Sequence, residues 1–249
     1  MITIKYLGGK SRICKKLGEF FNSKLAEREN QVFVDLFCGS CNVVAEIDSK
    51  YHRIANDKHK YLIAMWKAMQ EGWIPPDTCS EEEYRYIKQN KDNNMALSGF
   101  IGFACSFGGR WFEGYARRKD AYRNYCIEGK RGNIRLIENM KNVQFENKDY
   151  KDLEIPDGAI VYCDIPYKGK KQYSLKECGK FNHNEFYDWV EKNKHRFDIY
   201  ISEYKESVPD GFKIVWEKES KTGLGNINNE KIKTTEALIT PTKIYNRVR

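Results

Sequence analysis

The sequence contains no stretch of about 18 consecutive apolar residues, so it lacks a segment long enough to cross a bilayer as a helix. Its opening residues, MITIKYLGGK, also lack the apolar core of a secretory signal. We therefore expect a cytoplasmic, intracellular protein with no membrane partner. In that compartment the eight cysteines are expected to be reduced thiols.

A metal site is not expected, because the sequence lacks a second set of ligands. Cys38 and Cys41 form a C-x-x-C, but a zinc site needs another close pair of Cys or His, and none is present. A redox motif is compatible with the same segment, FCGSCN, and so is a turn after a strand. The pattern therefore predicts no metal and leaves these two interpretations open.

Two glycine-rich nucleotide motifs are incomplete. A phosphate loop requires a glycine at the position of Ile4, which argues against a nucleotide triphosphatase. DLFCGSCN has Gly39 but no full G-x-G-x-x-G, which argues against close approach to a pyrophosphate. Asp57 follows about 20 residues later, where an acid can bind ribose hydroxyls. S-adenosylmethionine, which carries adenosine without phosphate, fits this pattern.

Strand-like and helical patterns alternate along the chain. The strand-like segments are 31–37, 53–57, 142–150, 157–164, 198–204, 212–217 and 236–240. Helices are expected at 11–25 with Ser11 as cap, directly after CGSCN, at 59–69, and at 182–197 with Asn182 or Asn184 as cap. This order predicts an α/β fold with a mostly parallel sheet and an antiparallel end.

The segment between about 70 and 140 breaks this alternation. Residues 97–118 are rich in glycine and aromatics without a clear period, so a hairpin or irregular loops are expected there. We predict a main domain formed by 1–68 and 142–249, with 69–141 as an inserted lobe.

Four predicted strands end at or near an acid: Asp35, Asp57, Asp149 and Asp164. Any one of them is explained equally well as a solvated strand end or a helix cap. Ligands of open α/β sheets bind outside the carboxyl ends of the strands, and four acids at one such edge predict a site.

The formal net charge is +8, and its distribution is uneven. Between residues 110 and 135, eight Lys and Arg stand against three Asp and Glu, a net +5, with five Trp, Phe and Tyr among them. A solvated basic face is the simplest interpretation. The interleaved aromatics favour a nucleic-acid surface, with Arg110, Arg117, Arg118, Lys119 and Arg123 as candidate contacts.

Three motifs in order resemble the DNA adenine methylase (Dam-like) family, the D12 class of N6-adenine methyltransferases. YLGGK, with Tyr6 and Lys10, resembles the W-A-G-G-K element, and FCGSC (37–41) resembles F-x-G-x-G. Asp164-Ile165-Pro166-Tyr167 resembles D-P-P-Y. The resemblance covers most of the chain outside the 69–141 insert. No single motif is specific, but the ordered set is.

The resemblance implies a Rossmann-like methyltransferase sheet with an inserted, mainly helical DNA-recognition lobe. It implies an S-adenosylmethionine-dependent DNA (adenine-N6) methyltransferase that acts on a flipped-out adenine in double-stranded DNA. Bacterial or phage origin fits the family, and a GATC-like target is a family-level expectation. The size and the absence of an evident partner helix favour a monomer.

Site roles follow from the resemblance, residue by residue. Asp164 and the main-chain carbonyl of Pro166 would accept the two N–H bonds of the target amine, and Tyr167 would stack on the extruded base. A half-buried aromatic at a turn is the alternative for Tyr167, and a strand-end cap is the alternative for Asp149. The expected cofactor-binding residues are Tyr6, Lys10, Asp35, Phe37, Gly39, Ser40, Asp57, Asp149 and Asp164.

Two departures from the family pattern motivate rival hypotheses. Cys41 replaces a glycine, where only glycine adopts positive φ freely, and Ile165 replaces a proline. A catalytically silent DNA-binding relative is one alternative, and a methyltransferase acting on RNA adenine or on cytosine N4 is another. Burial of the Asp164 carboxylate in an ion pair would count against its proposed role.

Overall fold

The computed structural model describes residues 9–117, 123–167, 175–225 and 231–242. Its sheet has seven strands in the order β3-β2-β1-β4-β5-β7-β6. The first five are mutually parallel, and β7 runs antiparallel to both β5 and β6. The strands are β1 Val32–Asp35, β2 His52–Asn56, β3 Val143–Glu146, β4 Ile160–Cys163, β5 Asp198–Tyr204, β6 Phe212–Gly225 and β7 Lys231–Pro241.

Helices cover both faces of this sheet, as a doubly wound α/β fold requires. The α-helices of the described residues are α1 Cys14–Ala26, α2 Lys60–Gln70, α3 Glu81–Gln89, α4 Met95–Ala104, α5 Tyr125–Glu138, α6 Leu175–Cys178 and α7 His183–Asn193. The predicted Rossmann-like fold with an antiparallel end is therefore confirmed. None of these helices combines the length and the apolar character needed to cross a bilayer.

Alternation along the buried strands sends their side chains into two cores. Phe33 of β1 and Tyr162 of β4 lie in the core that α1, α2 and α4 share. Their neighbours Val34 and Val161 lie in the second core, which α7 completes with Phe186. Both faces of the parallel strands are thus closed, and their carboxyl ends remain as the edge at which polar residues can gather.

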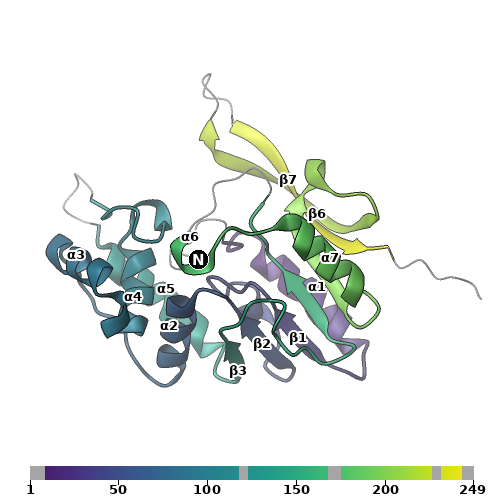
Figure 1. Cartoon of the computed structure of the whole chain (residues 1–249), viewed down its shortest axis with the longest axis horizontal. Coiled ribbons are helices and arrows are strands. Elements are labelled where there is room, and N and C mark those ends of the chain that lie inside the picture. The colour runs from purple at the N-terminus through teal and green to yellow at the C-terminus, as the bar shows by residue number, and fades with distance from the viewer. Residues whose placement is uncertain (1–8, 118–122, 168–174, 226–230, 243–249) are drawn as a thin grey trace, which may run out of the picture.

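Helices α3, α4 and α5, all between β2 and β3 in sequence, lie beside the sheet on the side away from α7 and β6 (Figure 1). The inserted lobe is therefore mainly helical. Its proposed limits at 69 and 141 stay a prediction, since α2 shares one core with α4 and with β1.

The expectation of a hairpin or irregular loops at 97–118 was wrong for its first part, which forms α4. This helix is buried nearly all round, so it has no polar face to produce a helical period. A Cβ on Gly99 would lie 2.1 Å from the Tyr61 carbonyl oxygen, and one on Gly102 2.2 Å from the Trp111 ring. The two glycines therefore allow close packing and do not break the helix.

Two other local expectations also failed. The helix expected after CGSCN is only a 3₁₀ turn, Val44–Glu46. Helix α1 begins at Cys14, and its N-cap Ile13 forms no side-chain cap bond, so Ser11 is not the cap. The cap at α7 is confirmed, because Asn182 Oδ1 accepts from the backbone N–H groups of Asn184 and Glu185.

Candidate active site at the carboxyl edge of the sheet

The structure brings the four predicted acids to one edge. Asp35 ends β1, and Asp57, Asp149 and Asp164 follow β2, β3 and β4. These strands are parallel neighbours, so their carboxyl ends point the same way. Four strand ends that are far apart in sequence therefore present carboxylates to one region.

Asp35 is the most deeply buried of these acids, at 2% exposure. Its Oδ1 has no hydrogen-bond partner among the described residues. Burial, and then the negative charges of Asp164 and Asp57, raise the pKa of Asp35 well above its usual value. A buried carboxyl with an unpaired oxygen at this edge is costly for folding and is therefore a candidate ligand-binding group.

The loop after β1 has the backbone that the family motif predicts. Gly39 and Cys41 both have positive φ, 46° and 57°. Cys41 thus keeps a glycine-like conformation despite its side chain, which is buried. The Trp66 indole N–H donates to the Gly39 carbonyl at 3.2 Å, and the Asn42 amide donates to Ser40 Oγ at 2.6 Å. The turn is therefore held by its own contacts.

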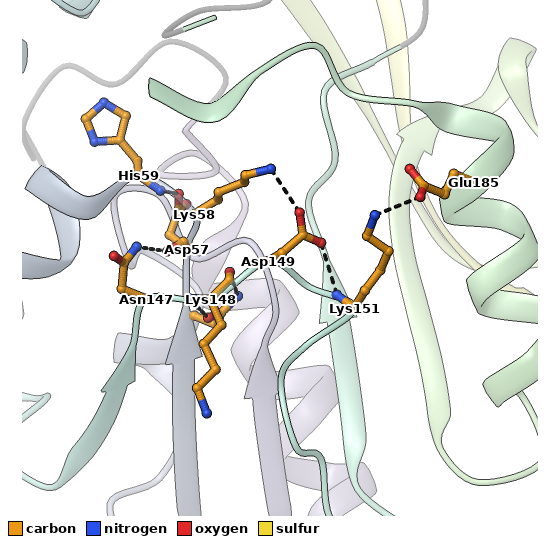
Figure 2. Close-up of polar contacts among 9 residues, drawn as sticks. Asp57, Lys58, His59, Asn147, Lys148, Asp149, Lys151 and Glu185 are labelled. Carbon is orange, nitrogen blue, oxygen red and sulfur yellow. Dashed lines mark hydrogen bonds and ion pairs between the residues drawn. The ribbon is translucent and has the colours of Figure 1, made fainter. Parts of the chain in front are cut away.

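Asp57 connects this loop to the start of α2. Its Oδ2 accepts from the backbone N–H of Gly39 at 2.9 Å, and its Oδ1 accepts from that of His59 at 2.8 Å. Asn147 donates to the Asp57 carbonyl, as Figure 2 shows. Burial raises the pKa of Asp57, although the two N–H donors oppose the shift. Each carboxylate oxygen retains one further lone pair for a ligand.

Asp149 lies beside Asp57 at the next strand end and forms an ion pair with Lys58, at 2.9 Å (Figure 2). It also accepts from the backbone N–H of Lys151 at 3.2 Å. Burial raises its pKa, but these two donors outweigh burial, and the pKa of Asp149 is lowered. Asp149 thus stabilises the strand end through its contacts with Lys58 and Lys151. A contact with a cofactor stays a prediction.

Asp164 forms an ion pair that sequence reasoning did not predict. The ammonium group of Lys10 donates to Asp164 Oδ1 at 2.7 Å, and the side chains are 7% and 21% exposed. Burial raises the pKa of Asp164, while the positive charge of Lys10 opposes that shift. Lys10 is one of the expected cofactor-binding residues. It lies against the first residue of the D-I-P-Y motif, and its contact with a cofactor stays a prediction.

Tyr167 is held on three sides. Its hydroxyl donates to Glu236 Oε2 of β7 at 2.6 Å, and its ring meets Tyr204 edge-on at 4.6 Å between centroids. Lys10 Nζ lies 4.8 Å from the ring centroid. Sequence reasoning missed Glu236, which carries no motif and comes next to Tyr167 only through the antiparallel end of the sheet.

The carbonyl of Pro166 already has a partner. The Nε2–H of His183, the first residue of α7, donates to it at 2.7 Å. Ile165 is buried in the second core, so the residue that replaces the family's proline anchors the motif by packing. The motif is therefore fixed at Asp164, Ile165, Pro166 and Tyr167 in turn.

Phe37 joins an aromatic group beside this edge. Its ring lies 5.5 Å from that of Tyr150 and 5.8 Å from that of Phe181, between centroids. The Tyr150 hydroxyl is buried without a hydrogen-bond partner in the described part of the chain. An apolar wall with one unsatisfied hydroxyl is the kind of surface that accepts a ring bearing a polar edge.

The candidate DNA contacts lie in the helical lobe, away from the acids. Three of them form ion pairs with glutamates: Arg110 with Glu113, Arg117 with Glu81, and Arg123 with Glu128. Arg118 and Lys119, together with Tyr6 of the first motif, lie outside the described residues. Within the described residues, no group of three His, Cys, Asp or Glu side chains has an arrangement that could hold a metal ion.

Two solved structures show a distant similarity to this one. PH1948 from Pyrococcus horikoshii, provisionally described as an RNA methyltransferase, is 11% identical, with 94% of this chain and 84% of that chain covered and a TM-score of 0.39. TehB from Haemophilus influenzae is 9% identical, with 90% and 62% covered and a TM-score of 0.35. At TM-scores this low the likeness carries no argument about this chain.

A family model provides the more specific comparison. The model described as D12 class N6 adenine-specific DNA methyltransferase matches residues 6–100. This range contains YLGGK, the turn at Gly39 and the strand that ends before Asp57. The match supports the family predicted from the motifs: over residues 6–100 the chain is similar to the D12 class of N6 adenine-specific DNA methyltransferases.

Proposed function

We propose that the chain transfers a methyl group from S-adenosylmethionine to the N6 amine of an adenine extruded from double-stranded DNA. The observation that carries this proposal is the arrangement around the D-I-P-Y motif. A carboxylate, a main-chain carbonyl and an aromatic ring follow one another at Asp164, Pro166 and Tyr167, at the edge where the other acids gather.

The residues beside this motif fit the proposed cofactor. Asp35 Oδ1 and the Tyr150 hydroxyl have no hydrogen-bond partner among the described residues, so they offer polar partners in buried surroundings. Gly39, Ser40 and Phe37 would line the turn, Asp57 would meet ribose hydroxyls, and Asp149 would meet the adenine amine. When bound, the cofactor supplies an electrophilic methyl group.

The chain's own groups would prepare the amine. Its lone pair is conjugated with the purine ring, so the nitrogen is a weak nucleophile. Acceptance of one N–H by Asp164 and of the other by the Pro166 carbonyl favours the pyramidal nitrogen and frees the lone pair. After transfer, the Asp164 carboxylate stabilises the positive charge on the nitrogen and holds the proton that leaves.

The ion pair with Lys10 bears on this role. The ammonium group bonds Asp164 at Oδ1, and the side chain keeps 21% of its surface exposed. The pair therefore does not enclose the carboxylate, and its positive charge favours the ionised form that accepts an N–H bond. Burial of Asp164 in an ion pair was expected to count against this role, and the pair is present, with Lys10 buried and Asp164 partly buried.

Extrusion is required because N6 cannot be reached inside a duplex. Tyr167 would support the extruded base, since a base stacked on an aromatic ring gains about 1–3 kcal/mol by alanine substitution. Its hydrogen bond to Glu236 and its contact with Tyr204 fix the ring before a base arrives. The basic lobe would hold the phosphates on either side.

A methyl-transfer assay tests the proposal. Radiolabelled S-adenosylmethionine would be incubated with duplex DNA or with RNA of the same sequence, and the product nucleosides would be resolved. We expect N6-methyladenine from duplex DNA, with a rate reduced about 10²–10⁴-fold in Asp164→Ala. Asp210→Ala, which changes an exposed acid of the same type, should keep the wild-type rate.

The other outcomes identify the rival functions. Methylated RNA adenine or N4-methylcytosine as the main product would replace the proposed substrate. Absence of transfer, with unchanged DNA binding by Asp164→Ala and no cofactor binding in calorimetry, would instead identify a silent DNA-binding relative. Sedimentation of the same preparation checks the expected monomer.

A further inference from the structure

Three of the eight cysteines meet in the helical lobe, away from the edge described above. Cys105 caps the end of α4 and Cys126 lies in the first turn of α5, and their sulfur atoms are 3.2 Å apart. Cys79, which precedes α3, interacts through its thiol with Cys105. Cys105 is therefore the thiol that interacts with both of the others.

The three thiols differ in exposure. Cys105 and Cys126 are buried at 3% and 2%, whereas Cys79 is partly exposed. All three line one cavity of about 460 Å³, together with residues such as Ser80, Tyr115 and Arg123. A small solute that enters this cavity reaches Cys79 without unfolding the lobe.

Hydrogen bonds to main-chain carbonyls hold the three cysteines' segments in place. The Tyr115 hydroxyl donates to the Cys79 carbonyl at 2.7 Å, and the Asn124 amide donates to the Asp77 carbonyl at 2.9 Å. The backbone N–H of Ala116 donates to the Cys105 carbonyl at 2.8 Å. The segments that carry the three thiols are therefore held by contacts besides those of the sulfur atoms.

We propose that Cys79, Cys105 and Cys126 form a peroxide-reactive site in which oxidation that starts at Cys79 ends as a disulfide between Cys105 and Cys126. The geometry requires one small adjustment, because a disulfide has an S–S length of about 2.05 Å. The hydrogen bond from Cys105 lowers the pKa of the Cys79 thiol, and the pKa of Cys105 is raised, so Cys79 ionises first.

The oxidation proceeds in three balanced steps. The Cys79 thiolate attacks hydrogen peroxide, so that an S–O bond forms, the O–O bond breaks and the departing hydroxide is protonated to water. Cys105 then attacks Cys79 Sγ, which forms an S–S bond and expels a second water with the thiol proton. Finally Cys126 attacks Cys105 Sγ, and Cys79 leaves as a thiol. Two thiols have then reduced one peroxide.

The product would join the end of α4 to the start of α5. Cys105 and Cys126 stand 21 positions apart in sequence, and the segment between them carries Arg110, Arg117 and Arg123. Oxidation would thus close this basic segment into a covalent ring. This inference does not depend on the substrate of the methyltransferase, because it concerns thiol chemistry alone.

The test treats the full-length protein with hydrogen peroxide and maps disulfides by mass spectrometry of unreduced digests. We expect a Cys105–Cys126 crosslink that dithiothreitol reverses, formed about tenfold more slowly in Cys79→Ser. Cys126→Ser should accumulate a Cys79–Cys105 crosslink, and Cys105→Ser should leave a dimedone-reactive sulfenic acid on Cys79. Cys14→Ser, which changes another buried thiol, should oxidise as the wild type does.

Two results would overturn the proposal. One is oxidation of Cys79→Ser at the wild-type rate, and the other is a first crosslink between Cys38 and Cys41 in place of the one expected. If a serine variant fails to fold, the kinetics of alkylation in the wild-type protein decide the point. Cys79 must then react with iodoacetamide before Cys105 and Cys126, and any other order contradicts the relay.

Discussion

Asp35 is a residue of the candidate site whose ionisation lowers the stability of the folded protein. Its folded-state pKa is raised, so the unfolded state releases the proton first, and stability falls as pH rises above the ordinary value of about 3.9. Asp35→Asn does not titrate. The free energy of unfolding of this variant should therefore be about 1–3 kcal/mol higher than that of the wild type at pH 8. The difference should vanish near pH 4. Urea unfolding at both pH values measures this, and a gap that stays constant with pH would contradict it.

Tyr167 allows its ring and its hydroxyl to be tested separately. Tyr167→Phe keeps the ring and loses the bond to Glu236, worth about 0.5–1.5 kcal/mol, so kcat/KM should fall roughly 2- to 13-fold. Glu236→Gln retains an acceptor, so its kcat/KM should fall less. Tyr167→Ala also loses stacking, by about 1–3 kcal/mol more. Equal rates for the Phe and Ala variants in steady-state methyl transfer would show that the ring does not bear on the reaction.

At the scale of elements, α4 depends on two glycines for its packing. Gly99→Ala gains about 1 kcal/mol of helix propensity, but its Cβ would lie 2.1 Å from the Tyr61 carbonyl oxygen. We expect net destabilisation of about 1–3 kcal/mol in urea unfolding. Gly114→Ala is the matched control, because no atom lies within 4 Å of its added Cβ. Equal stability of the two variants would show that α4 can move away from α2.

The same helix marks where prediction from sequence succeeded and where it failed. The strands that end near Asp35, Asp57 and Asp164 were predictable, because a short buried strand appears in the sequence as a local run of apolar residues. Helix α4 was missed because full burial removes the period and close packing requires glycine. The contact of Glu236 with Tyr167 depends on β7 pairing beside β5, and no local pattern encodes a pairing between residues 69 positions apart.

At the scale of the whole molecule, the charge of +8 predicts salt-dependent binding to DNA. Each phosphate contact adds a slope of about −0.9 to log K against log salt. Arg117→Ala should reduce the slope by about 1 in fluorescence anisotropy. Arg196→Ala, which also removes an arginine paired with an acid but lies after α7, should not change it. A flat salt response of the wild type would exclude the basic lobe as the contact surface.

The Asp57 carboxylate makes two distant parts of the molecule thermodynamically dependent on each other. One of its oxygens holds the turn at Gly39, and the other holds His59, whose ring packs edge-on against Trp111 of the lobe at 4.3 Å. A small molecule that competes for this carboxylate therefore also acts on the support of the lobe. Linkage is reciprocal: if the first ligand changes the affinity for a second ligand by some factor, the second changes the affinity for the first by the same factor.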